Sequence, residues 1–272
     1  MKIVQRIAAV ALFLGFLLPE AWGQGLAPRG ITEPYRDATL SATVAGTLAA
    51  ICKKEGERVS AGEVILELAK DLESLEVERR RLVAESKVEL EAARRRAEQL
   101  RQELAATRSL YDSTRSVSRE ELQQKELETQ LAESELERQS IAEARESIEL
   151  RIAEAQLQQR SISSPFNGLI AEIVPEIGEA CYPQQPLVRV VDVSRCRLIV
   201  HLEAAAASDL EAGKPAQLRF EGLRPPNLVR GVVEYVSPVV DPASGLVEVK
   251  VLFDNPGGRI RPGLSGTLLL KQ

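Results

Sequence analysis

The stretch ATVAGTLAAICKKEGERVSAGEVI, residues 42–65, occurs a second time in altered form as PFNGLIAEIVPEIGEACYPQQPL, residues 165–187. Each copy alternates apolar and polar residues in short bursts, a pattern typical of half-buried strands. Glycines mark turns in both copies, because glycine adopts a positive φ without a Cβ clash. With an offset of 122 residues, the copies agree at six pairs of positions: Gly46 with Gly168, Leu48 with Ile170, Ile51 with Ile173, Gly56 with Gly178, Glu57 with Glu179, and Ile65 with Leu187.

Each copy predicts about two strands and a tight turn, which is marginal on its own in water because one apolar face stays uncovered. Two such pieces placed face to face cover each other. We therefore expect a small β-sandwich assembled from both copies. The segment between the copies must then leave this sandwich and return to it, so we expect it to project as a hairpin.

The intervening residues 72–160 contain no Pro and no Gly and are rich in Glu, Arg and Leu. This composition predicts helix. Three-and-four spacing, typical of a coiled coil, runs through both halves of the segment. In the first half the seam is Leu90, Ala93, Ala97, Leu100, Leu104, Thr107 and Tyr111. In the second half it is looser, with Leu127, Leu131, Ser134, Ile141, Ile148, Ile152 and Ala155, interrupted by Arg138 and Arg145.

The reversal of this hairpin is predicted near Ser118. Ser118 followed by Glu121 forms a capping box that starts a second helix, so the first helix should end near Asp112. Each arm then reaches roughly 60 Å at 1.5 Å per residue. One small sandwich does not need such a reach, so we expect the arms to span the distance to a partner. The looser return seam leaves room for packing between neighbouring hairpins.

The amino terminus resembles a secretory signal. Lys2 and Arg6 precede an apolar run, residues 7–18, and small residues follow it. The run is too short to span a bilayer, so we expect an exported protein, with a cleaved signal peptide or an anchor retained at this end. The formal charge of −5 gives no reason to expect nucleic acid as a partner. The 28% of charged residues and 4% of aromatic residues suggest an elongated molecule.

Residues that could carry chemistry are few. Cys52, Cys181 and Cys196 match no metal-ligand spacing; they either form one of three disulfides or serve as small apolar side chains. His201 is the only histidine and stands in a strand pattern. No nucleophile motif, phosphate loop or metal cluster is present in the sequence. We therefore expect no enzyme activity, no cofactor and no metal.

The residues after the second copy predict further strands. Alternating apolar runs are separated by turns rich in Pro and Gly, among them Asp241-Pro242 and Arg261-Pro262-Gly263. Together, the split repeat, the helical insertion and this strand-rich end resemble the periplasmic adaptor subunits, or membrane fusion proteins, of efflux pumps and type I secretion systems. The resemblance extends from about Thr39 to the end of the chain.

This resemblance implies an α+β fold, elongated, with a lipoyl-like β-sandwich split by a long antiparallel α-helical coiled-coil hairpin and followed by a β-barrel domain. The implied divisions are a signal peptide at 1–23, a linker at 24–38, lipoyl-like halves at 39–71 and 161–193, the hairpin at 72–160, and the barrel at 194–272. Many relatives continue into a membrane-proximal domain. Because the sequence given ends at Gln272, we expect the barrel or another chain to meet the transporter.

The family's partners are an inner-membrane transporter, an outer-membrane channel of the TolC type and further copies of the adaptor, commonly six in a ring. Adaptors that meet such a channel often carry Arg, Leu and Ser at the hairpin tip, with Leu four and Ser eleven residues after Arg. Here Ser118 fits, Arg108 lies ten residues before it, and Tyr111 stands where Leu would be. We predict partner contact at Arg108, Tyr111, Ser116 and Ser118, although helix capping is an equal explanation for Ser118.

Two other functions compete with the adaptor. Carrier domains of lipoyl-like fold hold their cofactor on a Lys ten residues after the glycine that corresponds to Gly62, but this position is Leu72, and Lys70 nearby fits a solvated surface residue. We therefore reject the carrier. The second alternative is a structural tether in the cell envelope, whose hairpin pairs with another coiled coil and which transports nothing.

Overall fold

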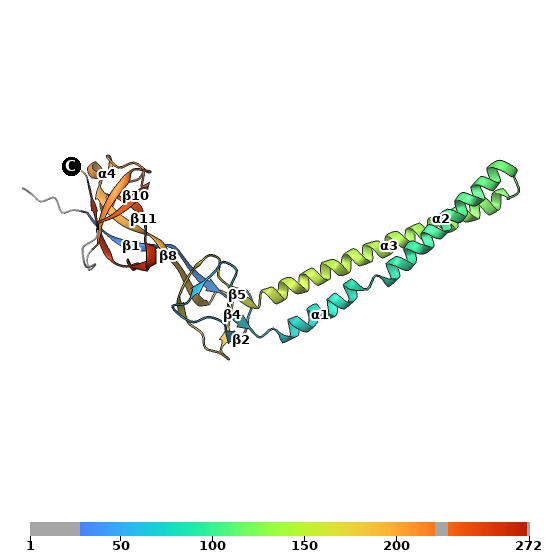
Figure 1. Ribbon diagram of the computed structural model, residues 1–272, viewed down its shortest axis with the longest axis horizontal. Coiled ribbons are helices and arrows are strands. Elements are labelled where there is room, and N and C mark those ends of the chain that lie inside the picture. Colours follow the sequence, from blue (N-terminus) through green and yellow to red (C-terminus); the bar gives the residue numbers. More distant parts are fainter. Residues whose placement is uncertain (1–27, 221–227, 271–272) are drawn as a thin grey trace, which may run out of the picture. The chain divides into compact units, whose positions relative to one another are not determined.

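The computed structural model describes residues 28–220 and 228–270, which form strands and helices in two compact units (Figure 1). The predicted mixture of α and β structure is thereby confirmed. The first unit comprises residues 34–196 with 255–260, and the second comprises the described parts of residues 1–33, 197–254 and 261–272. The predicted signal segment, residues 1–23, lies outside the described residues. No described helix is both long and apolar enough to cross a bilayer.

The strands of the two copies pair with each other in the first unit. The first copy supplies β2 (Gly46–Ile51), β3 (Arg58–Val59) and β4 (Val64–Leu68), and the second supplies β6 (Gly168–Ile173), β7 (Ala180–Cys181) and the start of β8 (Pro186–Glu203). Strand β2 is antiparallel to β7, with Gly46 opposite Cys181. Strand β3 is antiparallel to β6, with Val59 opposite Gly168. The same 122-residue offset relates these two pairings, so the unit has an internal two-fold relation.

Backbone hydrogen bonds across the copies obey the same relation. The amide of Gly56 donates to the Ile170 carbonyl at 2.8 Å, and the amide of Gly178 donates to the Leu48 carbonyl at 2.8 Å. Both glycines have positive φ, 81° and 91°, a conformation that costs little without a Cβ. The matched glycines of the repeat therefore place the two turns where each copy bonds to the other.

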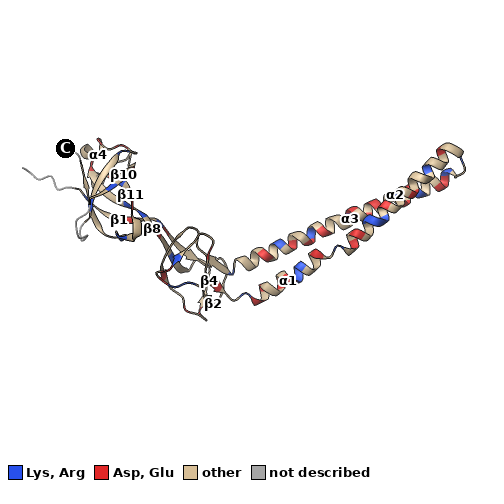
Figure 2. Cartoon of the chain, in the orientation of Figure 1, with Lys and Arg blue, Asp and Glu red and all other residues tan. Residues whose placement is uncertain are grey.

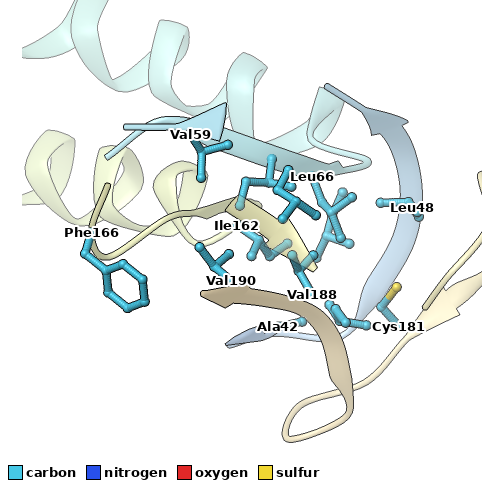
Figure 3. Close-up of a cluster of buried hydrophobic side chains, with 13 residues drawn as sticks. Ala42, Leu48, Val59, Leu66, Ile162, Phe166, Cys181, Val188 and Val190 are labelled. Carbon is cyan, nitrogen blue, oxygen red and sulfur yellow. The ribbon is translucent and has the colours of Figure 1, made fainter. Parts of the chain in front are cut away.

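A single buried cluster lies between the copies (Figure 3). Burial of side chains of this size contributes about 1.5–3 kcal/mol each relative to full exposure. Neither copy could bury these side chains alone, so folding of each copy depends on the other. The cluster includes Leu48, Val59, Ile65, Leu66 and Leu68 from the first copy, Ile170, Cys181, Leu187, Val188 and Val190 from the second, and Ala42, Ile162 and Phe166 beside them.

Three helices separate the copies. The outbound arm consists of α1 (Asp71–Glu85) and α2 (Val88–Thr114), and the return arm is α3 (Arg119–Gln158) (Figure 1). The outbound arm was expected to be one helix ending near Asp112, but it is interrupted where Ser86 adopts an extended backbone, with φ −77° and ψ 96°. It ends two residues later than expected. No Pro or Gly marks the interruption, so composition alone does not predict it.

The seam expected on the outbound arm faces α3, with Ala97 fully buried and the other six positions half-buried. The seam expected on the return arm is wrong, because its large apolar side chains lie in solvent. The face of α3 toward the outbound arm instead contains Leu122, Lys125, Thr129, Ala132, Leu136, Gln139, Glu143, Glu146, Leu150, Ala153 and Leu157, buried or half-buried at the same three-and-four spacing.

Ion pairs between the two arms accompany the inner face of α3. Lys125 pairs with Glu103 at 3.0 Å and Glu143 with Lys87 at 3.5 Å, each across the two arms. Glu146 lies 3.8 Å from Arg80 of α1. Each of these charged residues of α3 lies opposite a residue of opposite charge on the outbound arm. Hydrophobic periodicity counts apolar residues and does not detect such a match.

The second unit is a strand barrel. Its sheet order is β1 (Arg29–Ser41), β12 (Ser265–Leu269), β9 (Pro215–Phe220), β10 (Leu228–Val236), β11 (Leu246–Asp254) and β8, and a further pairing of β1 with β8 closes it. Helix α4 (Ala204–Ala207) follows β8. Alternating burial along β11 directs Val247, Val249, Val251 and Phe253 inward. The short helix η1 (Pro256–Gly258) belongs to the first unit.

The repeat generates a stability prediction at one pair of turns. Gly62, with φ 82°, corresponds to Gln184, with φ 68°, and nothing lies within 4 Å of a Cβ built on Gly62. Because a side chain in the left-handed region is strained, Gly62→Gln should lower the free energy of unfolding by about 1 kcal/mol. Gln184→Gly should raise it by less, because Gly gains entropy in the unfolded chain. Urea denaturation measures both, and equal values for Gly62→Gln and the wild type would contradict this reading.

Candidate functional site: the turn between the helical arms

The outbound arm ends in an unusual backbone conformation. Arg115, which caps α2, has φ 52° and lies in the left-handed region, a conformation that costs a non-glycine residue about 1–2 kcal/mol. Its guanidinium carbon lies 4.6 Å from the ring centroid of Tyr111. This cation–π contact offsets about 0.5–1 kcal/mol at an exposed site. The contact holds Tyr111 and Arg115 together at the end of α2.

The return arm begins with the predicted cap. Ser118 has an extended backbone, and its Oγ accepts a hydrogen bond from the Glu121 amide at 3.1 Å. Glu120 and Glu121 occupy the first turn of α3, where a negative charge is favourable beside the unpaired amides of a helix start. The capping role of Ser118 is thereby confirmed, and a contact role remains a prediction.

The remaining predicted residues lie in different surroundings. Ser116 is exposed in the turn, with its Oγ 2.7 Å from the Thr114 hydroxyl oxygen. Arg108 lies one helical turn before Tyr111 and donates from Nη2 to Glu126 Oε1 of α3 at 2.6 Å. The turn thus exposes Ser116 and Ser118, whereas Tyr111 is half-buried near the end of α2 and Arg108 joins the two arms. Sequence reasoning missed Arg115, and no pattern identifies it, because Arg is not a residue expected at positive φ.

Further ion pairs connect the arms toward the turn, where acidic and basic residues follow each other along α2 and α3 (Figure 2). Lys125 donates to Glu103 and Glu128 at 3.0 and 3.1 Å, and the hydrogen bond from Lys125 holds the pKa of Glu103 below its usual range. Arg101 Nε donates to Glu133 at 2.6 Å. Each pair is partly exposed and contributes little alone because solvent screens it. Their spacing fixes which residues of the two arms lie side by side.

A second cluster fixes the base of the arms to the sheet. Arg160 donates from Nη2 to Glu73 Oε1 at 2.6 Å and from Nη1 to the Ala45 carbonyl at 3.0 Å. About a fifth of each ionic side chain is exposed. A Cβ on Gly46 would lie 2.8 Å from Arg160 Nη1, so the glycine admits the guanidinium. Arg160 therefore joins both arms to the strand that begins the repeat.

The three cysteines and Lys70 were the candidates for chemistry in the sequence. All three cysteines are free; Cys181 and Cys196 are buried and Cys52 is exposed. Burial raises the pKa of both buried thiols. Lys70 pairs with Glu67 at 2.7 Å. Within residues 28–220 and 228–270, no three His, Cys, Asp or Glu side chains are grouped so that they could hold a metal ion.

Comparison with known proteins supports the architecture. Residues 198–272 match the family described as CusB-like, beta-barrel domain. The structure is similar to that of MacA from Actinobacillus actinomycetemcomitans, with a TM-score of 0.72 and 18% identity over 89% of this chain and 76% of that one. It is also similar to the membrane fusion protein Spr0693 from Streptococcus pneumoniae R6, with a TM-score of 0.57 and 15% identity over 89% and 97% of the respective chains.

The chain therefore has the fold of MacA and of the membrane fusion protein Spr0693. Its last 75 residues are identified with the CusB-like β-barrel domain family. An uncharacterized protein of Haemophilus influenzae is 24% identical over 240 residues, 88% of this chain and 55% of that protein. The chain thus spans about half the length of this curated relative.

Substitution of Ser118 tests its role as the cap of α3. Ser118→Ala removes the acceptor for the Glu121 amide and should cost the start of α3 about 1 kcal/mol, whereas Ser118→Asp keeps an acceptor and should cost little. Hydrogen exchange of the amides at residues 120–122 measures the difference. Faster exchange in the alanine variant alone is expected. Equal exchange in both variants would show that the cap does not stabilise this end of the helix.

Proposed function

We propose that the chain is a non-enzymatic periplasmic adaptor of a tripartite efflux or type I secretion system, bridging an inner-membrane transporter to an outer-membrane channel. The observation that carries the proposal is the pair of helical arms that ends in an exposed turn. α3 has 40 residues, so its turn lies roughly 60 Å along the helix from the sheet. The likeness to membrane fusion proteins supports the same function.

In this proposal, the two copies of the repeat with β5 (Ser161–Ser163) form a lipoyl-like sandwich, and the arms form the coiled-coil hairpin that splits it. The proposed divisions remain 39–71 and 161–193 for the lipoyl-like halves, 72–160 for the hairpin and 194–272 for the barrel. Residues 1–23 direct export to the periplasm. Several copies assemble into a ring, with six as the number that the resemblance implies.

The turn would contact a channel of the TolC type. Arg115 lies against the ring of the half-buried Tyr111, and Ser116 offers an exposed hydroxyl. Aromatic and Arg side chains are enriched where proteins bind one another. Arg108 would contribute by aligning the arms through Glu126. The barrel, or another chain, would meet the transporter.

The alternative is an envelope tether without a transport role. Large apolar side chains exposed along α3, such as Ile141 and Ile148, favour it, because they offer a surface to another helix. Both functions require an exported chain with paired arms. They differ in partners, because a tether would purify with neither a transporter nor a channel.

A photo-crosslinking amino acid at Ser116 tests the proposal in intact cells of the source bacterium. The expected product joins the full chain to an outer-membrane channel, because the side chain is exposed at the turn. The matched control is the same amino acid at Ser140, which is exposed midway along α3 and should not capture the channel. Mass spectrometry identifies each product, and an affinity-purified chain should also retain an inner-membrane transporter.

Two results would contradict the adaptor. Capture of assorted periplasmic proteins at Ser116, in the same pattern as at Ser140, would show that the turn has no dedicated partner. Capture of another coiled-coil protein, without a transporter in the purified complex, would support the tether.

A further inference from the structure

The face of the outbound arm that meets α3 changes its spacing between α1 and α2. In α2 this face contains Leu90, Ala97 and Tyr111 at the three-and-four spacing of a coiled coil. In α1 it contains the buried Val77 and the half-buried Ala84, which lie seven residues apart, one full repeat. From Ala84 to Leu90 the separation is only six residues. The outbound arm is therefore one residue short of a continuous repeat, whereas α3 keeps the repeat without a break.

An unbroken outbound helix could not turn both of its segments toward α3. Seven residues bring an α-helix to within about 20° of two full turns, but six residues leave it about 120° short. If α1 continued directly into α2, either Val77 or Leu90 would face solvent. Instead, Ser86 leaves the helix with ψ 96°, and the Glu91 amide donates to the Lys87 carbonyl at 2.9 Å to start the next one. The interruption thus compensates for the missing residue.

Local chemistry does little to hold this interruption. Within residues 28–220, the side chain of Lys87 makes no capping hydrogen bond at the start of α2. The last turn of α1 has no basic residue, although a positive charge is favourable beside the unpaired carbonyls of a helix end. Helices that end by local signals usually have such caps. Packing of both segments against α3 therefore accounts for the interruption better than the sequence at the interruption itself.

The seam between the arms is polar at the level of the interruption. Within residues 137–149, the face of α3 toward the outbound arm contains no apolar side chain. Lys87 lies 3.5 Å from Glu143, and Arg80 lies 3.8 Å from Glu146. Such partly exposed ion pairs contribute less than buried apolar side chains do. The arms are thus held together more weakly at this level than on either side of it.

We propose that the interruption at Ser86 and Lys87 is a joint, at which α2 and the turn bend and rotate relative to the base of the hairpin. Figure 1 shows the outbound ribbon leaving helical form between α1 and α2 while α3 continues. A continuous helix curves gently, whereas the outbound arm has no continuous ladder of hydrogen bonds to oppose a bend. The joint is independent of the proposed function.

The position of the joint determines how far the turn can move. The start of α3 lies about 24 residues from Glu143, which is roughly 36 Å along the helix. A bend of about 10° at this level would displace the turn by about 6 Å. The base would stay in place during the bend, because Arg160 joins it to Glu73 and to the sheet.

Distances between pairs of spin labels test the joint in the full chain, with Cys52→Ser as background because Cys52 is the exposed thiol. Labels on Glu78→Cys and Arg95→Cys span the interruption. Labels on Arg95→Cys and Asp112→Cys are the matched control, because they span the same seventeen residues within α2 and all three positions are exposed. An unbroken helix places such labels about 26 Å apart. We expect a distribution of distances at least twice as wide across the interruption as within α2.

Insertion of one alanine between Ser86 and Lys87 tests the missing residue. It restores the seven-residue spacing from Ala84 to Leu90, so α1 and α2 should join into one helix. The distance distribution should narrow to the width measured within α2, and exchange of the amides at residues 88–90 should slow at least tenfold. Insertion of two alanines is the control, because it overshoots the repeat by one residue, about 100°, and should change neither measurement in this direction.

Two results would overturn the inference. Equal widths across the interruption and within α2, in the chain without an insertion, would show that the arm does not bend there. Equal amide exchange after insertion of one and of two alanines would show that the spacing does not cause the interruption. Both measurements use the isolated chain, so failure of Ser116 to capture a channel would count against the proposed function alone.

Discussion

Backbone pairing between the two copies of the repeat is the constraint on which the rest of this structure depends. Strands β2 and β3 have their antiparallel partners in β7 and β6, more than a hundred residues away. Each copy also supplies side chains to one buried cluster. Because neither half can satisfy its strands or cover its apolar face alone, the segment between them must begin and end at the same place. The return of the chain after α2 follows from this requirement.

The sequence was sufficient for features that depend on local chemistry or on a repeated pattern. The offset of 122 residues relates the pairing of Gly46 with Cys181 to that of Gly168 with Val59, because like sequences in a two-fold relation pair in like ways. Ser118 was identifiable as a cap, since capping needs a side-chain oxygen and an amide three residues on. The interior of the first unit follows from the same alternation.

Features that depend on contacts between residues far apart in the chain could not be predicted from the sequence. The return seam on α3 was assigned to Leu127, Leu131, Ile141, Ile148 and Ile152 because they are the more apolar set, but the face toward the outbound arm is the one whose charged residues pair with that arm. The interruption at Ser86 and the left-handed Arg115 have no compositional signal. At the turn, pattern reasoning located Tyr111, Ser116 and Ser118 but not Arg115 or its contact with the Tyr111 ring.

The sheet holds the two ends of the helical insertion side by side. Strand β4 before the arms pairs with β5 after them, with Leu66 opposite Ile162, and the Leu68 amide donates to the Arg160 carbonyl at 2.8 Å. The two ends of the insertion are thus fixed side by side whatever lies beyond them. Whole heptads can be added to or lost from both arms together without disturbing a strand. The length of the arms can therefore vary while the sheet that anchors them stays the same.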